Sequence, residues 1–113
     1  MKQTFDYLEN AAVSATVCDK DGIVVYQNKV AQNRDGDAIG KKLFKCHSPR
    51  SNEKIRHMLE AGESNTYETI KHGKRHFIHH TPWYENEGGE ISGLIEFEID
   101  IPDSHPTYNR DKE

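Results

Sequence analysis

Cysteine and histidine side chains that could bind a metal or react with a ligand occur in two segments of this sequence. The first segment contains Cys46 and His47, and His57 follows further along. A thiol beside histidine and lysine has a lowered pKa and is more nucleophilic, whereas a buried thiol packs as a small apolar group. A neutral imidazole is an axial ligand for haem iron, so His47 and His57 are candidate haem ligands. The alternatives are a backbone hydrogen bond for His47 and a boundary position on a helix for His57.

The second segment is a predicted hairpin that is rich in histidine. His76 and His80 share one face of a strand and His79 lies on the other, because side chains alternate along a strand. Further ligands would come from the turn or the paired strand, where the candidates are His72, Glu68 and Tyr67. A structural zinc site normally uses four Cys or His ligands at motif spacing, and this segment lacks them. Three interpretations fit these histidines: they are polar side chains on a solvated strand, they bind a metal, or they become protonated together at low pH.

No catalytic motif accompanies these residues. The sequence has no glycine-rich phosphate loop, no Gly-x-Ser-x-Gly elbow and no His-Glu-x-x-His pair. Cys46 and His47 are adjacent, and adjacent residues rarely adopt the geometry of a nucleophile and its base. With 113 residues, of which 34% are hydrophobic, the chain can form about one domain with a thin core. We therefore expect a domain that is not an enzyme.

The charge pattern bears on the partners of the chain. The net charge is -4, yet residues 41–80 carry nine Lys or Arg against four Asp or Glu, together with six of the seven histidines. Such a block attracts an anion, or it is a solvated face that the acidic C-terminal third neutralises. No basic stripe interleaves with aromatic residues, so we expect no nucleic-acid partner. No apolar run approaches the roughly 18 residues of a membrane span, so we expect a cytoplasmic chain without membrane contact.

Hydrophobic periodicity and turn residues divide the chain into elements. Asp21-Gly22 between two β-branched runs predicts a tight hairpin turn, and Gly62 after a helical apolar pattern predicts a helix end. The expected helices are 4–12, short turns within 29–45, and 51–61. The expected strands are 14–18, 23–28, 66–70, 75–84 and 91–101, with a polar loop at 85–90. This order predicts an α+β domain of about five antiparallel strands with the helices grouped on one side.

The final expected strand has the strongest alternation. Five apolar residues fall on one face: Ile91, Ile95, Phe97, Ile99 and Ile101. The other face carries Leu94 and three carboxylates. We expect the apolar face to pack against the helix at 51–61, whose Ile55, Met58 and Leu59 recur at helical spacing. These side chains would either line a cavity or fill it as a core.

Three stretches match the pattern of a known family in order and spacing. Residues 17–28 hold an Asp, a following Gly and a terminal Asn, residues 38–43 hold an Ile-Gly-Lys step, and residues 93–101 form a closing strand. Together they resemble the PAS sensor domain. The run Cys46-His47-Ser48-Pro49, followed by Ser51, also resembles the Cys-His-Pro-Pro-x-Ser segment of a PAS-like subgroup, with a different proline order. The resemblance covers about residues 5–102, which predicts one domain over 1–102 and a polar tail over 103–113.

The resemblance implies a five-stranded antiparallel sheet with short helices packed on one face, and a cavity for haem, flavin or a small metabolite. The candidate cofactor-binding residues are then His47, His57, Cys46, Ile55, Met58, Leu59, Ile95 and Phe97. A flavin adduct is not expected, because Cys46 lies six residues after Gly40, where light-sensing members have three. Family members usually signal by altering a dimer contact, and Phe5 and Leu8 of the first helix are candidates for it.

Three functions are consistent with these features. The first is a non-enzymatic sensory domain that binds a small ligand or cofactor and signals, as a homodimer, to a separate output protein. The second is a protein-interaction module with a filled core and no ligand. The third is a haem- or metal-dependent protein that uses His47 or His57.

Overall fold

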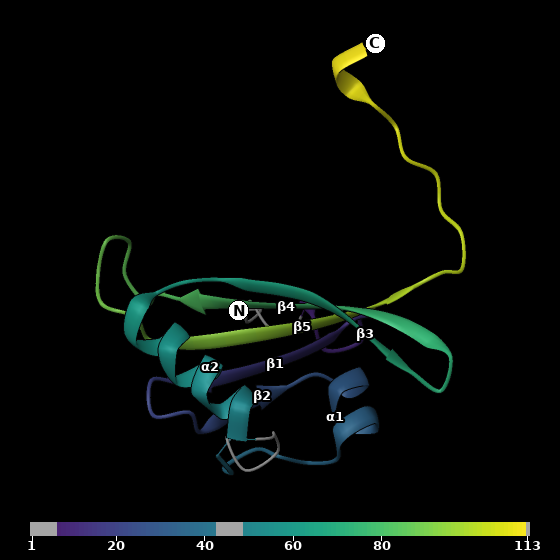
Figure 1. Cartoon of the computed structure of the whole chain (residues 1–113). Coiled ribbons are helices and arrows are strands. Elements are labelled where there is room, and N and C mark those ends of the chain that lie inside the picture. The colour runs from purple at the N-terminus through teal and green to yellow at the C-terminus, as the bar shows by residue number, and fades with distance from the viewer. Residues whose placement is uncertain (1–6, 43–48, 113) are drawn as a thin grey trace.

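Most of the predicted strands and helices are present in the computed structural model, which describes residues 7–42 and 49–112 (Figure 1). The strands are β1 (Ser14–Asp19), β2 (Val24–Gln27), β3 (Asn65–Lys71), β4 (Lys74–Trp83) and β5 (Gly93–Ile101). The helices are α1 (Lys29–Asp35), α2 (Pro49–Ala61) and a short 3-10 turn, η3 (Arg110–Lys112). The prediction of an α+β fold with a five-stranded sheet is confirmed.

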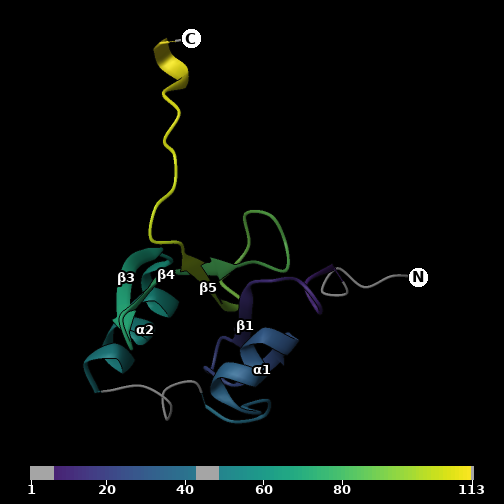
Figure 2. The same ribbon diagram turned by 90° about the vertical axis from the view of Figure 1, so that its right-hand side faces the viewer.

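The sheet is antiparallel throughout and has the strand order β2-β1-β5-β4-β3. The last strand of the chain therefore lies at the centre, between the β1–β2 hairpin and the β3–β4 hairpin. Helices α1 and α2 lie on the same side of this sheet (Figures 1 and 2). We call the side that packs against the helices the inner face and the opposite side the outer face.

The hydrophobic core lies between the inner face and the helical segment. Ile55 and Met58 of α2 are buried there against Cys18 and Leu94, and Leu59 packs on the edge of the same cluster. The predicted inward face of the helix at 51–61 is therefore confirmed. Because the cluster has few large side chains, α2 is held mainly by the burial of Ile55 and Met58.

The expected orientation of the final strand is wrong. Cys18 stands opposite Leu94 in the β1–β5 register, so Leu94 and the alternate residues Glu96 and Glu98 are on the inner face. Ile95 and Phe97 consequently belong to the outer face and do not line the space beside α2. Alternation in a sequence separates two faces of a strand, but it does not say which face the helices cover.

Two buried amides connect the N-terminal segment, β2 and α1. Asn28 Oδ1 accepts the N–H groups of Ala15 (3.0 Å) and Ala31 (3.1 Å), and the second of these bonds caps α1. Its Nδ2 donates to the carbonyls of Leu8 (2.8 Å) and Val13 (2.6 Å). The Asn28 amide is fully buried and all its hydrogen-bonding capacity is used.

The other buried amide, Gln27, fixes the loop that follows α1. Its Oε1 accepts the Ala38 N–H at 2.7 Å and its Nε2 donates to the Gly36 carbonyl at 3.1 Å. Ala38 is thereby held in the core cluster. The sequence predicts short helical turns within 29–45. In the described part of this range there is one helix, α1, followed by a loop that a side chain of β2 holds.

The expected helix at 4–12 is not seen in its described part. Residues 7–13 form turns, in which the Ala11 N–H donates to the Leu8 carbonyl at 3.1 Å, and Phe5 lies outside the described residues. At the other end, residues after Pro102 lead away from the sheet (Figure 2). Within 7–42 and 49–112 there is no helix with both the length and the apolar character of a membrane span.

Candidate functional site

The inner face carries a buried histidine–carboxylate pair beside the core. His80 of β4 and Glu96 of β5 stand opposite each other in the strand register, and His80 Nε2 lies 2.7 Å from Glu96 Oε2. The His80 side chain is only 3% exposed and that of Glu96 13%. The second ring nitrogen, His80 Nδ1, is also buried and has no hydrogen-bond partner in the described chain.

The unpaired nitrogen is the most unusual chemical feature of this pair. A buried polar atom without a partner costs about 1–3 kcal/mol, so folded proteins rarely keep one without a reason. Glu96, as a carboxylate, accepts a hydrogen bond from the Nε2–H group, and the neutral ring then presents Nδ1 as an acceptor. His80 is therefore arranged to accept one further hydrogen bond inside the protein.

Two residues of β3 lie beside His80 on the inner face. Asn65 stands directly opposite His80 in the β3–β4 register. The Tyr67 ring lies 5.9 Å from the His80 ring, tilted by 31°. Burial raises the pKa of Tyr67, and the nearby carboxylates of Glu96 and Glu98 raise it further, so this phenol stays neutral. Tyr67 thus presents an uncharged aromatic surface beside the pair.

A second polar cluster lies at the other end of the inner face. Arg34 of α1 donates to Glu98 Oε2 at 2.7 Å and to Asp100 Oδ1 at 2.6 Å. His76 Nδ1 lies 3.0 Å from the same Asp100 oxygen and 3.6 Å from Glu98. The hydrogen bond from Arg34 holds the pKa of Asp100 below its usual value. This cluster ties α1 to β5 and favours the ionised form of Asp100.

Near the His80–Glu96 pair, α2 and the start of β3 border an open hollow of about 420 Å³, whose lining includes neither member of the pair. Its lining includes Met58 from the core and Asn65, the cross-strand neighbour of His80. At its rim, His57 Nε2 lies 3.1 Å from Glu63 Oε2, and both side chains are more than 60% exposed. The volume is within the range of small-molecule sites.

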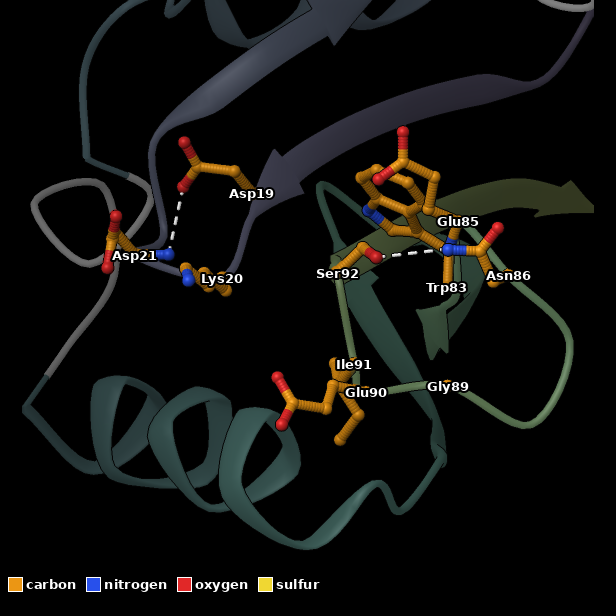
Figure 3. A pocket seen from close by; sticks show the side chains of 10 residues that line it. All are labelled: Asp19, Lys20, Asp21, Trp83, Glu85, Asn86, Gly89, Glu90, Ile91 and Ser92. Carbon is orange, nitrogen blue, oxygen red and sulfur yellow. Dashed lines mark hydrogen bonds between the residues drawn. The ribbon is translucent and has the colours of Figure 1, made fainter.

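Another hollow, of about 480 Å³, lies between the β1–β2 turn and the loop before β5 (Figure 3). Four acidic residues are among those that line it: Asp19, Asp21, Glu85 and Glu90. Asp19 accepts the backbone N–H of Asp21 at 2.9 Å, and Ser92 Oγ accepts that of Glu85 at 3.0 Å. These two bonds shape the turn and the loop and give the Asp19 and Ser92 side chains a structural role.

The structure brings together only part of the predicted site. Ile55, Met58 and Leu59 lie on the core side of α2, whereas Ile95 and Phe97 lie on the outer face and His57 lies at an exposed rim. Cys46 and His47 lie outside the described residues. The role of these residues in cofactor binding therefore remains a prediction, with no shared pocket among those described.

The histidines of the hairpin divide between the two faces as their spacing predicts. His79 lies on the outer face, where its Nδ1 is 2.7 Å from Thr66 Oγ1, while His76 and His80 each meet a carboxylate on the inner face. The described residues contain no group of three or more His, Cys, Asp or Glu that could hold a metal. The predicted site residues did not include Glu96 and Arg34. The carboxylates of β5 recur at every second residue, and His76 and His80 are four residues apart, so each set lies on one face of its strand.

Comparisons with known proteins identify the fold. No protein-family model matches the sequence, and no curated protein matches it. VqmA bound to DPO is 24% identical, with a TM-score of 0.70 over 88% of this chain and 56% of that chain. The PAS domain of Bordetella pertussis BvgS is 18% identical, with a TM-score of 0.65 over 87% of this chain and 83% of that one. The PAS domain of the histidine kinase ThkA is 20% identical, with a TM-score of 0.64 over 78% and 98%.

These similarities show that the chain has the PAS fold, as the sequence resemblance predicts. The chain spans about half the length of the VqmA chains that it matches. The resemblance to the Cys-His-Pro-Pro subgroup stays a prediction, because Cys46, His47 and Ser48 of its motif lie outside the described residues. The fold alone does not assign a ligand or a partner.

Proposed function

We propose that this chain is a sensory domain that binds a small ligand between the inner face of the sheet and α2, and signals through protein contacts. The observation that carries the proposal is the buried His80–Glu96 pair, with its unpaired nitrogen, beside the α2–β3 hollow. A packed structural core would place apolar side chains at such a position. Polar groups that converge beside a hollow are typical of a ligand site.

Similar structures support this proposal. VqmA is described as bound to DPO, and other VqmA structures are described with and without target DNA. The present chain matches about half of VqmA, so we propose that its output lies in a separate protein or segment. The expectation that it binds no nucleic acid itself remains a prediction.

Signal transfer would use the outer face. Phe77 of β4 and Ile99 of β5 are neighbours in the strand register and are 39% and 48% exposed. Exposed apolar groups in adjacent positions mark a contact surface. We propose that a second copy of the chain covers them, which makes the homodimer the signalling unit.

The same outer face favours a second candidate function, an interaction module that carries no ligand. In that case self-association would not depend on any small molecule. A third candidate, haem binding through His57, has less support because this side chain is exposed and lies beside Glu63. His47 stays a candidate ligand, although it lies outside the described residues.

Mass spectrometry under native and denaturing conditions tests the proposal directly. We expect the freshly purified chain to show a mass excess under native conditions that disappears on denaturation. A small-molecule screen that follows the melting temperature gives a second readout, because a ligand that binds only the folded state raises it. An unmodified mass together with no stabilising compound would contradict the proposal and support the interaction module.

A further inference from the structure

We propose that His80 Nδ1 accepts a hydrogen bond from the bound molecule, and that this molecule is a small, uncharged, aromatic compound with an N–H or O–H donor. The inference rests on the proposed ligand-binding function and specifies the chemistry of its site. It is carried by three features: the unpaired nitrogen, the charges around it and the side chains that cover it.

The hydrogen-bonding state of the His80 ring defines the ligand group. Glu96 Oε2 lies 2.7 Å from Nε2, which fixes the proton on that nitrogen when the ring is neutral. Nδ1 is then an acceptor with no partner among the described residues. Only a donor can satisfy it, so a ligand with a carbonyl or ether oxygen alone would leave the nitrogen unpaired.

The surrounding charges select against an anion. Glu96 belongs to the site, and Glu98 follows it on the same face of β5. Glu98 forms an ion pair with Arg34, and Arg34 also forms an ion pair with Asp100. The carboxylates outnumber this guanidinium at the described inner face of β5, so a carboxylate or phosphate ligand would meet repulsion there. A cationic ligand would lose its hydration on burial beside His80, which costs free energy. A ligand with an uncharged donor is therefore the best match.

Access to His80 would come from the hollow at the junction of α2 and β3. Asn65 both lines this hollow and stands opposite His80. The nitrogen itself is covered, so a ligand reaches it only when a neighbouring side chain moves. Tyr67 is suited to this movement because it lies on the edge strand, is 38% exposed and has its ring 5.9 Å from that of His80. The same ring would stack on an aromatic ligand.

Phenol and anisole form a matched pair of probes, since they differ in the O–H donor. The experiment follows the side-chain nitrogens of His80 by 15N NMR during titration of the full chain with each compound. We expect phenol to bind, to shift the Nδ1 resonance and to leave Nε2 protonated. Anisole should bind roughly tenfold more weakly, as expected for the loss of one hydrogen bond to a buried acceptor, and should leave Nδ1 unchanged.

Two matched variants separate the site from the fold. His80→Gln keeps an N–H donor for Glu96 at the place of Nε2 and removes the acceptor Nδ1. His79→Gln makes the same substitution one residue away, on the outer face. We expect His80→Gln to reduce phenol affinity to that of anisole and His79→Gln to leave it unchanged. Should His80→Gln fail to fold, the nitrogen shifts of the unmodified chain decide the question.

The inference is overturned if phenol does not bind, if phenol and anisole bind equally, or if His80→Gln binds phenol as the unmodified chain does. Its failure differs from that of the proposed function. A co-purified molecule that His80→Gln retains would keep the ligand-binding function and reject the role of His80. The absence of both a co-purified molecule and any binding of the two probes would reject both.

Discussion

Gly93 at the start of β5 passes so close to the Cys18 carbonyl of β1 that a side chain does not fit between them. A Cβ atom on Gly93 would overlap the Cys18 carbonyl oxygen and lie 2.6 Å from Trp83 Nε1. The same oxygen accepts the indole N–H of Trp83 at 2.9 Å. Three strands therefore meet at this oxygen, which fixes β5 against β1 and β4 at the end nearest the core.

Gly93→Ala should destabilise the fold strongly, because the methyl group meets backbone and not a flexible side chain. We expect a loss of at least about 3 kcal/mol, at the upper end of overpacking costs, in urea unfolding. Trp83→Phe is the control, since it removes the indole donor and part of the ring without creating an overlap, and should cost only about 1–2 kcal/mol. A Gly93→Ala chain as stable as the Trp83→Phe chain would show that the strands do not meet this closely.

Asn28→Ala should destabilise the chain by at least about 2 kcal/mol. The substitution removes the cap of α1, takes the side-chain acceptor away from the buried Ala15 N–H, and removes one hydrogen bond from each of the Leu8 and Val13 carbonyls. Asn33→Ala, on the exposed side of the same helix, is the control and should stay within about 0.5 kcal/mol. Thermal unfolding by circular dichroism measures both, and equal melting temperatures would contradict the role of Asn28.

The Arg34–Asp100 pair should give a small stabilisation that depends on pH. The pKa of Asp100 is lower in the folded state, so the pair stabilises above the unfolded value of about 3.9. This stabilisation is lost as the pH falls through the lower folded value. Asp100 is exposed, so the gain should stay below about 1 kcal/mol. Melting temperatures of Asp100→Asn and the unmodified chain should differ at pH 7 and converge in acid; a constant difference would refute the coupling.

Cys18 should be inert towards alkylation in the folded chain. Burial raises its pKa to about 11, so almost no thiolate exists at neutral pH. We expect iodoacetamide to modify Cys18 only after denaturant unfolds the core, as measured by peptide mass spectrometry. Alkylation of Cys18 at pH 7 without denaturant would show that the core around β1 opens readily.

The sequence predicted the order of elements because its local signals agree with the tertiary structure. The Asp-Gly turn is one example: Gly22 has a φ of 81°, and Asp19 accepts the N–H groups of Asp21 and Ile23. The helix that ends at Gly62 is another, with Ile55 and Met58 buried at helical spacing. Such signals depend only on residues that are close in the sequence, so they can be recognised without knowing which elements become neighbours in the fold.

The candidate site could not be predicted in the same way, because it depends on which strands are neighbours. His80 meets Glu96 only because β5 lies beside β4, and this register is a long-range property. The carboxylates of β5 looked like a solvated face, whereas paired histidine and arginine side chains allow them to lie on the covered side. The apolar alternation of β5 predicted the isoleucine face towards the helices, whereas the pairing of its carboxylates with distant residues is consistent with the opposite orientation.

The proposed dimer contact depends on Ile99, and Ile99→Glu should abolish self-association without unfolding the chain. Ile99 is 48% exposed on the outer face, so a carboxylate there costs little in the monomer but would be buried against a second copy. Ile39→Glu is the matched control, because Ile39 is 47% exposed on the loop after α1. Light scattering should then give a dimer for the unmodified chain and for Ile39→Glu, and a monomer for Ile99→Glu. A dimer that persists in Ile99→Glu would place the contact elsewhere and remove the outer face from the signalling path.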